Sequence, residues 1–201
     1  ERLLATPAVA IQRSQDIAAR MAEDSAQAMR LAMGLIQKFD RKSLDRVLEL
    51  ENNTDRYEDA LGTYLVQLSS RSLSVADSRI LNTLLYTISD VERIADHAVN
   101  VGKAALEMEE KKIVFSQQAQ GEREVLERAV SDILGRTVEA YRSFDRGLAR
   151  KVEPQEQVVD ALVREIKSRH IRRLREGTCS VEYGFVLEDL LTAFERTTAP
   201  M

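Results

Sequence analysis

The scarcity of helix-breaking residues is the feature that most constrains how this chain of 201 residues can fold. Only eight glycines and three prolines interrupt it, and tryptophan is absent. Glycine and proline destabilise the interior of a helix, so their scarcity favours long, continuous helices. A chain of this length can also bury a core of ordinary size without a disulfide or a structural metal. The sequence therefore predicts an all-α protein.

Capping residues and apolar periodicity divide the chain into six long helices. Asp40 or Ser43 caps the second helix, and Ser74 opens the third. Gly177 ends the fifth helix behind a cationic last turn. Val125 and Phe185 belong to the apolar positions expected to face the core. The expected helices cover residues 7–39, 43–69, 75–107, 117–148, 153–176 and 181–196.

An internal repeat relates the two halves of the chain. Glu51 and Asp55 recur 105 residues later as Glu156 and Asp160. Four further residues recur 103 residues later, namely Leu84, Ile88, Glu92 and Arg93 as Leu187, Leu191, Glu195 and Arg196. A difference of two residues in loop length reconciles the offsets. We expect two tandem three-helix bundles with pseudo-two-fold symmetry, in residues 1–112 and 113–201.

Charge and cysteine content exclude several classes of function. The net charge is −4, which provides no overall attraction for nucleic acid. Cys179 is the single cysteine, so neither an internal disulfide nor a zinc site of paired thiolates is expected. No apolar run is long enough to span a membrane, and the expected location is the cytoplasm. Because the chain begins at Glu1 rather than Met, a membrane part of a longer parent chain remains open.

Carboxylates four residues apart form a recurring pattern. Glu followed by Asp at this spacing occurs as Glu51/Asp55, Glu92/Asp96 and Glu156/Asp160. Such pairs share one face of a helix and repel each other, and a bound cation relieves this repulsion. Spacing alone does not identify a site, because acidic helix faces are usually solvated. Two of the three pairs also coincide with the internal repeat.

Two segments carry a resemblance to a known family. Residues 90–100, DVERIADHAVN, resemble the third-helix signature of PhoU proteins, and residues 51–55, ENNTD, resemble their second-helix acidic motif. The second half contributes EQVVD at residues 156–160. The opening residues 1–8 resemble the PhoU-type cytosolic tail of bacterial Na/phosphate cotransporters. The resemblance therefore covers nearly the whole chain.

The resemblance implies acidic faces that bind clusters of multivalent metal ions, typically iron or zinc. The first acidic face would consist of Glu51, Asp55, Glu92 and Asp96, with Asp90 close by. The second acidic face would consist of Glu156, Asp160 and Glu195. Ala199 stands where the repeat would place a fourth carboxylate, and Pro200 cannot continue the helix. We therefore expect the first acidic face to bind metal more tightly.

The function implied is that of a metal-binding regulatory domain in phosphate transport and phosphate homeostasis, as the tail of a Na/phosphate cotransporter. The alternatives are a free-standing PhoU-type regulator and a metal-free helical scaffold for protein interactions. The expected partner is a transporter membrane domain or a phosphate-signalling protein. Contact with the inner face of the membrane and oligomer formation stay open, as does direct binding of phosphate.

No enzymatic activity is expected. Diiron oxidases with helical bundles use Glu-x-x-His pairs, and neither His97 nor His170 has Glu three residues before it. Phosphate-loop and dinucleotide-binding motifs are also missing. His97 is expected to pack at a helix interface. The basic segment 164–175 is interpreted as an ordinary cationic helix end, with an anionic membrane or a phosphate-bearing partner as the alternative.

Overall fold

The computed structural model describes residues 6–143 and 146–199 and is 88% helix, with no strand in these ranges. The all-α prediction is confirmed. None of the described helices is long and apolar enough to cross a membrane. The helices are α1 (Pro7–Gln37), α2 (Arg41–Ser69), α3 (Val75–Lys111), α4 (Gln117–Ser143), α5 (Arg146–Ala149), α6 (Val152–Arg175) and α7 (Val181–Thr198).

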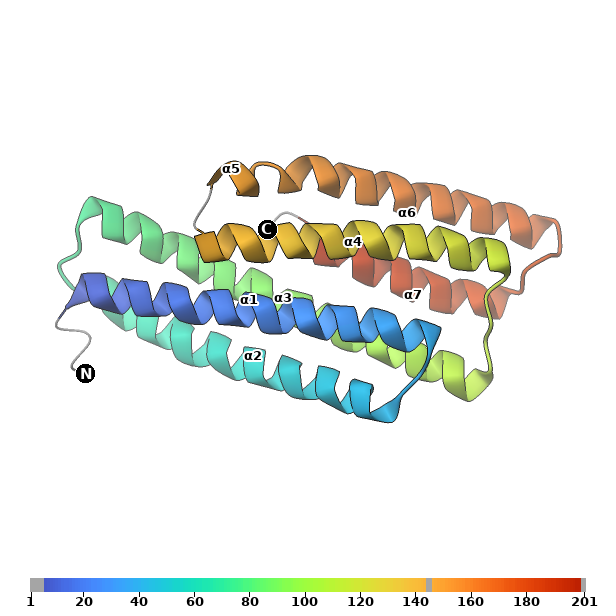
Figure 1. The fold of residues 1–201 in the computed structure, drawn as a ribbon, viewed down its shortest axis with the longest axis horizontal. Coiled ribbons are helices and arrows are strands. Elements are labelled where there is room, and N and C mark those ends of the chain that lie inside the picture. The colour runs from blue at the N-terminus through green and yellow to red at the C-terminus, as the bar shows by residue number, and fades with distance from the viewer. Residues whose placement is uncertain (1–5, 144–145, 200–201) are drawn as a thin grey trace.

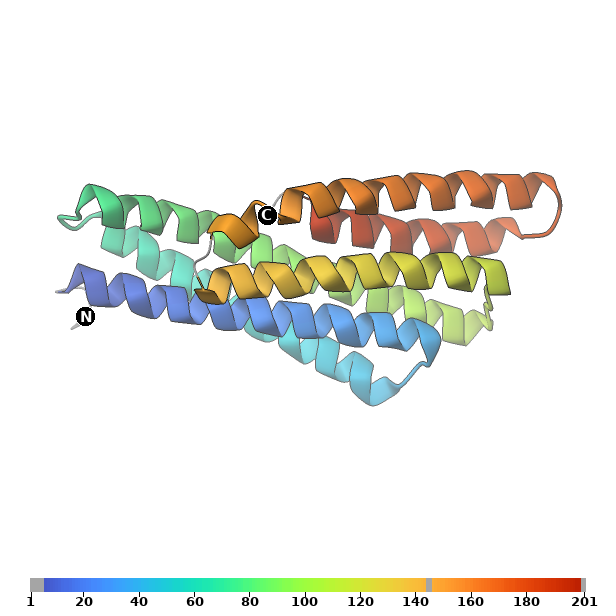
Figure 2. The same cartoon turned by 45° about the horizontal axis from the view of Figure 1, so that its top comes forward.

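The long helices form two bundles that lie side by side. Helices α1, α2 and α3 pack on one another, and so do α4, α6 and α7. Contacts between α1 and α4 and between α3 and α7 join the bundles into an elongated molecule (Figure 1). A second view shows the hairpin of α6 and α7 extending beyond the first bundle at one end (Figure 2).

Helix α1 lies at the centre because it contacts α2, α3 and α4. Small side chains allow three helices to approach it closely. Two buried serines accompany the alanines, and Ser14 satisfies its hydroxyl by donating to the carbonyl oxygen of Ala10 at 2.9 Å. The buried alanines of α1 are Ala10, Ala18, Ala22, Ala26, Ala28 and Ala32.

Side-chain caps start the helices where the sequence predicts them. The Asp40 carboxylate accepts hydrogen bonds from the backbone N–H groups of Lys42 and Ser43 and so caps α2. Ser74 accepts from the N–H of Asp77 at 3.0 Å and caps α3. These bonds satisfy donors that the first turn of a helix leaves unpaired.

Three details differ from the sequence-based expectation. Helix α3 continues to Lys111, and its left-handed C-cap Lys112 ends it four residues later than expected. The helix expected to reach residue 148 ends at Ser143, and α5 follows as a separate turn. The side chains of Val125 and Phe185 are 42% and 69% exposed, so they do not face the core. Helical periodicity locates an apolar stripe but not its edges, which the neighbouring helices decide.

Candidate functional site

The first acidic face forms on the adjoining helices α2 and α3. Glu51 and Asp55 are one turn apart on α2, and Glu92 and Asp96 are one turn apart on α3. The two pairs influence each other across the helix interface, because the charge of Asp96 raises the pKa of Glu51 and that of Asp55 raises the pKa of Glu92. The structure therefore brings together the four carboxylates that the sequence assigned to this face.

Burial and mutual repulsion disfavour negative charge on this face. Burial is the main cause that raises the pKa of Glu92 to about 7, followed by the charges of Asp96, Glu58 and Asp55. Burial also raises the pKa of Glu51, and Lys103 opposes that shift. A carboxyl group with a pKa near 7 is partly protonated at neutral pH, so a cation that binds here competes with a proton.

Glu58 is a member of this acidic cluster that the sequence analysis missed. It lies on α2 three residues after Asp55, and it accepts a hydrogen bond from the Ser89 hydroxyl of α3 at 2.8 Å. The available signal was the spacing from Glu51 to Asp55 to Glu58, which keeps all three on one helix face. The cluster on α2 and α3 thus has five carboxylates.

Asp90 faces a different neighbour. Arg93 donates to it at 2.8 Å. Burial raises the pKa of Tyr141 on α4, and the negative charge of Asp90 adds to that rise. Asp90 is not among the charges that shift the pKa of Glu51 or Glu92. Residues 90 and 92 are about 200° apart around a helix, so α3 directs them to different sides.

The described side chains form no ready-made metal centre. No three His, Cys, Asp or Glu side chains in residues 6–143 and 146–199 are arranged so that they could hold one ion. The donor types of the first acidic face suit hard or borderline cations, since all are carboxylate oxygens. Metal binding there requires the side chains to turn toward a common point.

The second acidic face is smaller. Burial is the main cause that raises the pKa of Glu156, with the charges of Asp160 and Glu153 on the same helix adding to it. The charge of Glu195 on α7 is not one of the charges that shift the pKa of Glu156. Ala199 is the C-cap that follows α7, and Pro200 lies outside the described residues. The structure therefore places two of the three expected carboxylates together and does not link the third to them.

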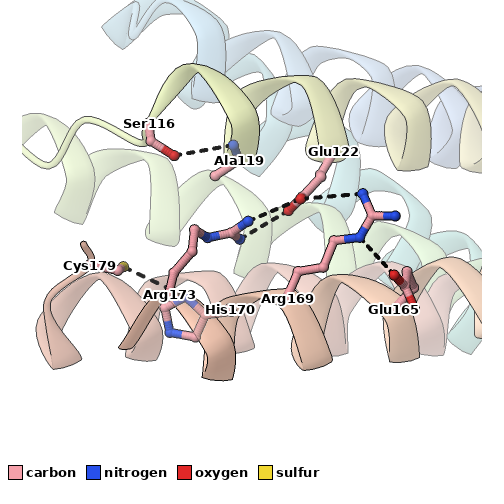
Figure 3. A network of polar contacts seen from close by, with 8 residues as sticks. All are labelled: Ser116, Ala119, Glu122, Glu165, Arg169, His170, Arg173 and Cys179. Carbon is pink, nitrogen blue, oxygen red and sulfur yellow. Dashed lines mark hydrogen bonds and ion pairs between the residues drawn. The ribbon is translucent and has the colours of Figure 1, made fainter. Parts of the chain in front are cut away.

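A buried ion pair joins α4 to α6 (Figure 3). Arg173 donates to both carboxylate oxygens of Glu122, at 3.0 and 2.9 Å. Arg169 lies 3.5 Å from the same carboxylate and pairs with Glu165 at 2.7 Å. Part of the basic segment 164–175 therefore has a structural role.

The two histidines occupy helix interfaces. His97 and Arg196 line a cavity of about 330 Å³ between α3 and α7, and burial, with Arg196 next in effect, lowers the pKa of His97. His170 lies 3.7 Å from the sulfur of Cys179. A Cβ atom at position 184 would lie 2.7 Å from its Nε2, so Gly184 provides the space for this ring.

Comparison with known proteins gives one consistent family. The model of the PhoU domain matches residues 18–105 and 125–198. A phosphate-specific transport system accessory protein PhoU homolog from Xylella fastidiosa is 24% identical over 179 residues, which cover 85% of this chain and 73% of that protein. A PhoU homolog 1 from Thermotoga maritima is 27% identical over 149 residues, which cover 70% of this chain but only 60% of that protein.

Solved structures share the fold. The phosphate transport system regulatory protein PhoU from Streptococcus pneumoniae superimposes with a TM-score of 0.83 at 14% identity, covering 96% of this chain and 90% of that one. PhoU from Pseudomonas aeruginosa superimposes with a TM-score of 0.76 at 18% identity, covering 97% and 90%. At these identities the likeness concerns the architecture of the two bundles.

Proposed function

This chain belongs to the PhoU family, and from that premise we propose that it regulates phosphate transport as a non-enzymatic accessory protein whose first acidic face binds multivalent metal ions. The names of the related proteins support the regulatory part, since they describe accessory and regulatory proteins of phosphate transport. These names favour a PhoU-type regulator over the tail of a Na/phosphate cotransporter. No related protein named above is a cotransporter, so the tail stays a prediction.

The single observation that supports metal binding is the crowding of carboxylates on α2 and α3. The pKa values of Glu51 and Glu92 are raised partly by neighbouring carboxylates, Asp96 among them. In the described part of the chain, no Lys or Arg forms an ion pair with Glu51, Asp55, Glu92 or Asp96. Glu51 and Glu92 are half-buried, whereas Asp55 and Asp96 are exposed. Their mutual repulsion costs free energy that a multivalent cation can offset.

A bound ion would supply positive charge and open coordination positions. Glu51 and Asp55 would approach it from α2, and Glu92 and Asp96 from α3. Iron and zinc are the ions that the family resemblance implies, and carboxylate oxygens are suitable ligands for both. Since the ion would join two helices of the first bundle, its binding would stabilise their packing and provide a charged surface for a partner of the phosphate transport system.

The metal-free scaffold is the second candidate. The observation in its favour is that no three metal-binding side chains among the described residues converge as they stand. Long helices with exposed outer faces would then serve protein contacts alone. The two candidates differ in whether multivalent metal ions bind to the purified protein.

The proposal is tested by elemental analysis and calorimetric titration with Zn²⁺ and Fe²⁺. Substituting Asp55→Ala with Asp96→Ala should abolish most tight binding, because it removes one ligand from each helix of the first acidic face. The matched control, Glu156→Ala with Asp160→Ala, should cost little metal, because the second acidic face offers fewer grouped ligands. Equal losses in the two double variants would contradict this asymmetry. Absence of tight binding to the unaltered protein would favour the scaffold.

The regulatory part is tested separately in cells. Removing the gene segment that encodes these residues should change phosphate uptake or its response to phosphate supply. Uptake that is unaltered at every phosphate level would contradict the regulatory role. Because this measurement does not depend on metal content, its failure is distinguishable from failure of the metal site.

A further inference from the structure

Apolar and cationic side chains share the outer face of the hairpin that α6 and α7 form. Lys167 pairs with Glu188 at 2.8 Å across the exposed seam between these two helices. Ile171 lies one turn after Lys167 on α6, and Phe185 lies three residues before Glu188 on α7, so both flank this seam. We call this surface the hairpin face, and it consists of Arg164, Lys167, Ile171 and Arg175 of α6 with Val181 and Phe185 of α7.

The apolar side chains of the hairpin face are open to solvent. Ile171 is 49% exposed, Val181 is 65% exposed and Phe185 is 69% exposed. A single exposed apolar residue is ordinary, but a group of them often marks a surface that binds a protein or a membrane. Burying these side chains against an apolar environment would be favourable.

Arginine adds positive charge that is not compensated within the protein. Arg164 and Arg175 are exposed, and neither forms an ion pair with a residue that the structure describes. Two other arginines of α6 instead reach the buried carboxylate of Glu122 (Figure 3). Residues 161–185 contain six Lys or Arg and three Glu, so their net charge is +3, whereas that of the whole chain is −4. The hairpin is therefore a positive region of an acidic protein.

The equivalent hairpin of α2 and α3 in the first bundle lacks these features. The internal repeat relates the two hairpins by offsets of 105 residues for α2 and α6 and 103 residues for α3 and α7. The exposed residues Asp59, Ser70 and Asn82 occupy the positions equivalent to Arg164, Arg175 and Phe185. The fold therefore does not require arginine or phenylalanine at these positions.

We propose that the hairpin face binds the surface of a lipid bilayer that contains anionic lipids. Arg164 and Arg175 would contact the lipid phosphate groups, and Ile171 and Phe185 would enter the boundary between headgroups and acyl chains. A bilayer accounts for the charge and the apolar side chains together, whereas a nucleic acid would account for the charge alone. The hairpin extends beyond the first bundle at one end, which leaves room for a flat surface to approach (Figure 2). This inference goes beyond the proposed function and does not depend on metal binding.

Tryptophan fluorescence tests the proposal, because the chain contains no tryptophan. Phe185→Trp places one reporter on the hairpin face, and Asn82→Trp places a matched reporter on the equivalent hairpin. With vesicles of phosphatidylcholine and phosphatidylglycerol in EDTA, the emission of Phe185→Trp should shift to shorter wavelength and that of Asn82→Trp should not. Vesicles of phosphatidylcholine alone should shift neither reporter, because they have no net charge to attract the arginines.

Arginine substitutions made together with Phe185→Trp test the role of charge. Arg164→Gln with Arg175→Gln should weaken binding to the anionic vesicles by about tenfold or more. The matched control, Arg71→Gln with Arg79→Gln, removes two exposed arginines near the connection of α2 to α3, at the opposite end of the molecule (Figure 1). It should change binding by less than about twofold, because salt screens charges that are far from the bilayer.

Four results would overturn the proposal. The emission of Phe185→Trp does not shift with anionic vesicles, or neutral vesicles shift it equally. The control pair of arginine substitutions weakens binding as much as the pair on the hairpin face. Soluble oligoglutamate produces the same shift as the vesicles, which would identify an acidic protein as the partner instead of a bilayer.

Discussion

Individual charged residues in this protein differ in how their charge is compensated. Glu122 and Arg173 are both almost fully buried and satisfy each other through two hydrogen bonds. Glu51 and Glu92 are half-buried, and burial first and neighbouring carboxylates second raise their pKa values. The first arrangement contributes to the packing of α4 on α6. The arrangement around Glu51 and Glu92 places carboxylates that repel one another at the surface, which is typical of a binding site.

Glu92 should make the stability of the metal-free protein depend on pH. Its pKa is about 7 in the folded state, compared with an ordinary value of 4.5, so the folded state binds the proton more tightly than the unfolded state does. The free energy of unfolding therefore falls as the pH rises from 4.5 through 7. Glu92→Gln should raise the urea midpoint at pH 8 in the presence of EDTA and leave it unchanged at pH 4. A midpoint that is unaffected at pH 8 would contradict the raised pKa.

The buried ion pair should be costly to break and less costly to replace. Arg173→Met leaves the Glu122 carboxylate buried beside only the more distant Arg169, and it should lower the free energy of unfolding by about 3–5 kcal/mol. Adding Glu122→Leu should recover most of this loss, because no unpaired charge remains. Urea denaturation measures both values. A single variant that loses under about 1 kcal/mol would mean that water compensates the carboxylate.

The helices differ in what determines their ends. Helices α2, α3 and α7 begin with side-chain caps, and each cap is readable as Asp or Ser before the helix. Helix α3 ends at Lys111, and its C-cap Lys112 adopts a left-handed conformation with φ of 54°. Glycine is the usual residue in that conformation, and Gly177 adopts it after α6. The sequence consequently predicted the end of α6 better than that of α3.

Replacing the strained cap of α3 should stabilise the protein. Lys112→Gly removes the steric conflict between Cβ and the backbone in the left-handed region, and it should raise the free energy of unfolding by about 0.5–1 kcal/mol. The exposed pair of Lys112 with Glu109 is lost, but such pairs contribute little. Gly177→Ala is the opposite control and should destabilise the protein by a similar amount. Urea midpoints that move in the other direction would show that φ does not control these positions.

The two bundles pack against each other at the scale of the whole molecule. Helix α7 contacts α3 more extensively than it contacts α4 and α6 together, and α4 also packs on the central helix α1. One hydrophobic cluster runs through both bundles. The division into residues 1–112 and 113–201 stays a prediction, although the internal repeat motivates it.

The second bundle should therefore not fold well by itself. Residues 113–201 expressed alone lose the apolar surfaces of α1 and α3, so they should show a weak helical signal by circular dichroism and no cooperative thermal transition. Residues 1–112 keep the extensive contacts among α1, α2 and α3 and should retain helical structure. A cooperative transition in the isolated second half would show that its own core is sufficient.

The sequence by itself determined the helices and most of their ends. Both depend on local spacing or capping, which acts within a few residues and is visible in one dimension. The grouping of carboxylates from α2 and α3 into the first acidic face came from the family resemblance instead. Helical spacing also carried the signal that Glu58 shares a face with Asp55 and that Asp90 points away from Glu92, but the sequence analysis missed Glu58 and expected Asp90 close to the first acidic face.

Only the tertiary structure decided which helices share a surface. The pair of Glu122 with Arg173 spans 51 residues, and the cavity beside His97 is formed by parts of α3 and α7. The exposure of Phe185 is of the same kind. Each of these depends on how far one helix rotates against another, and side-chain packing across the whole core sets that rotation.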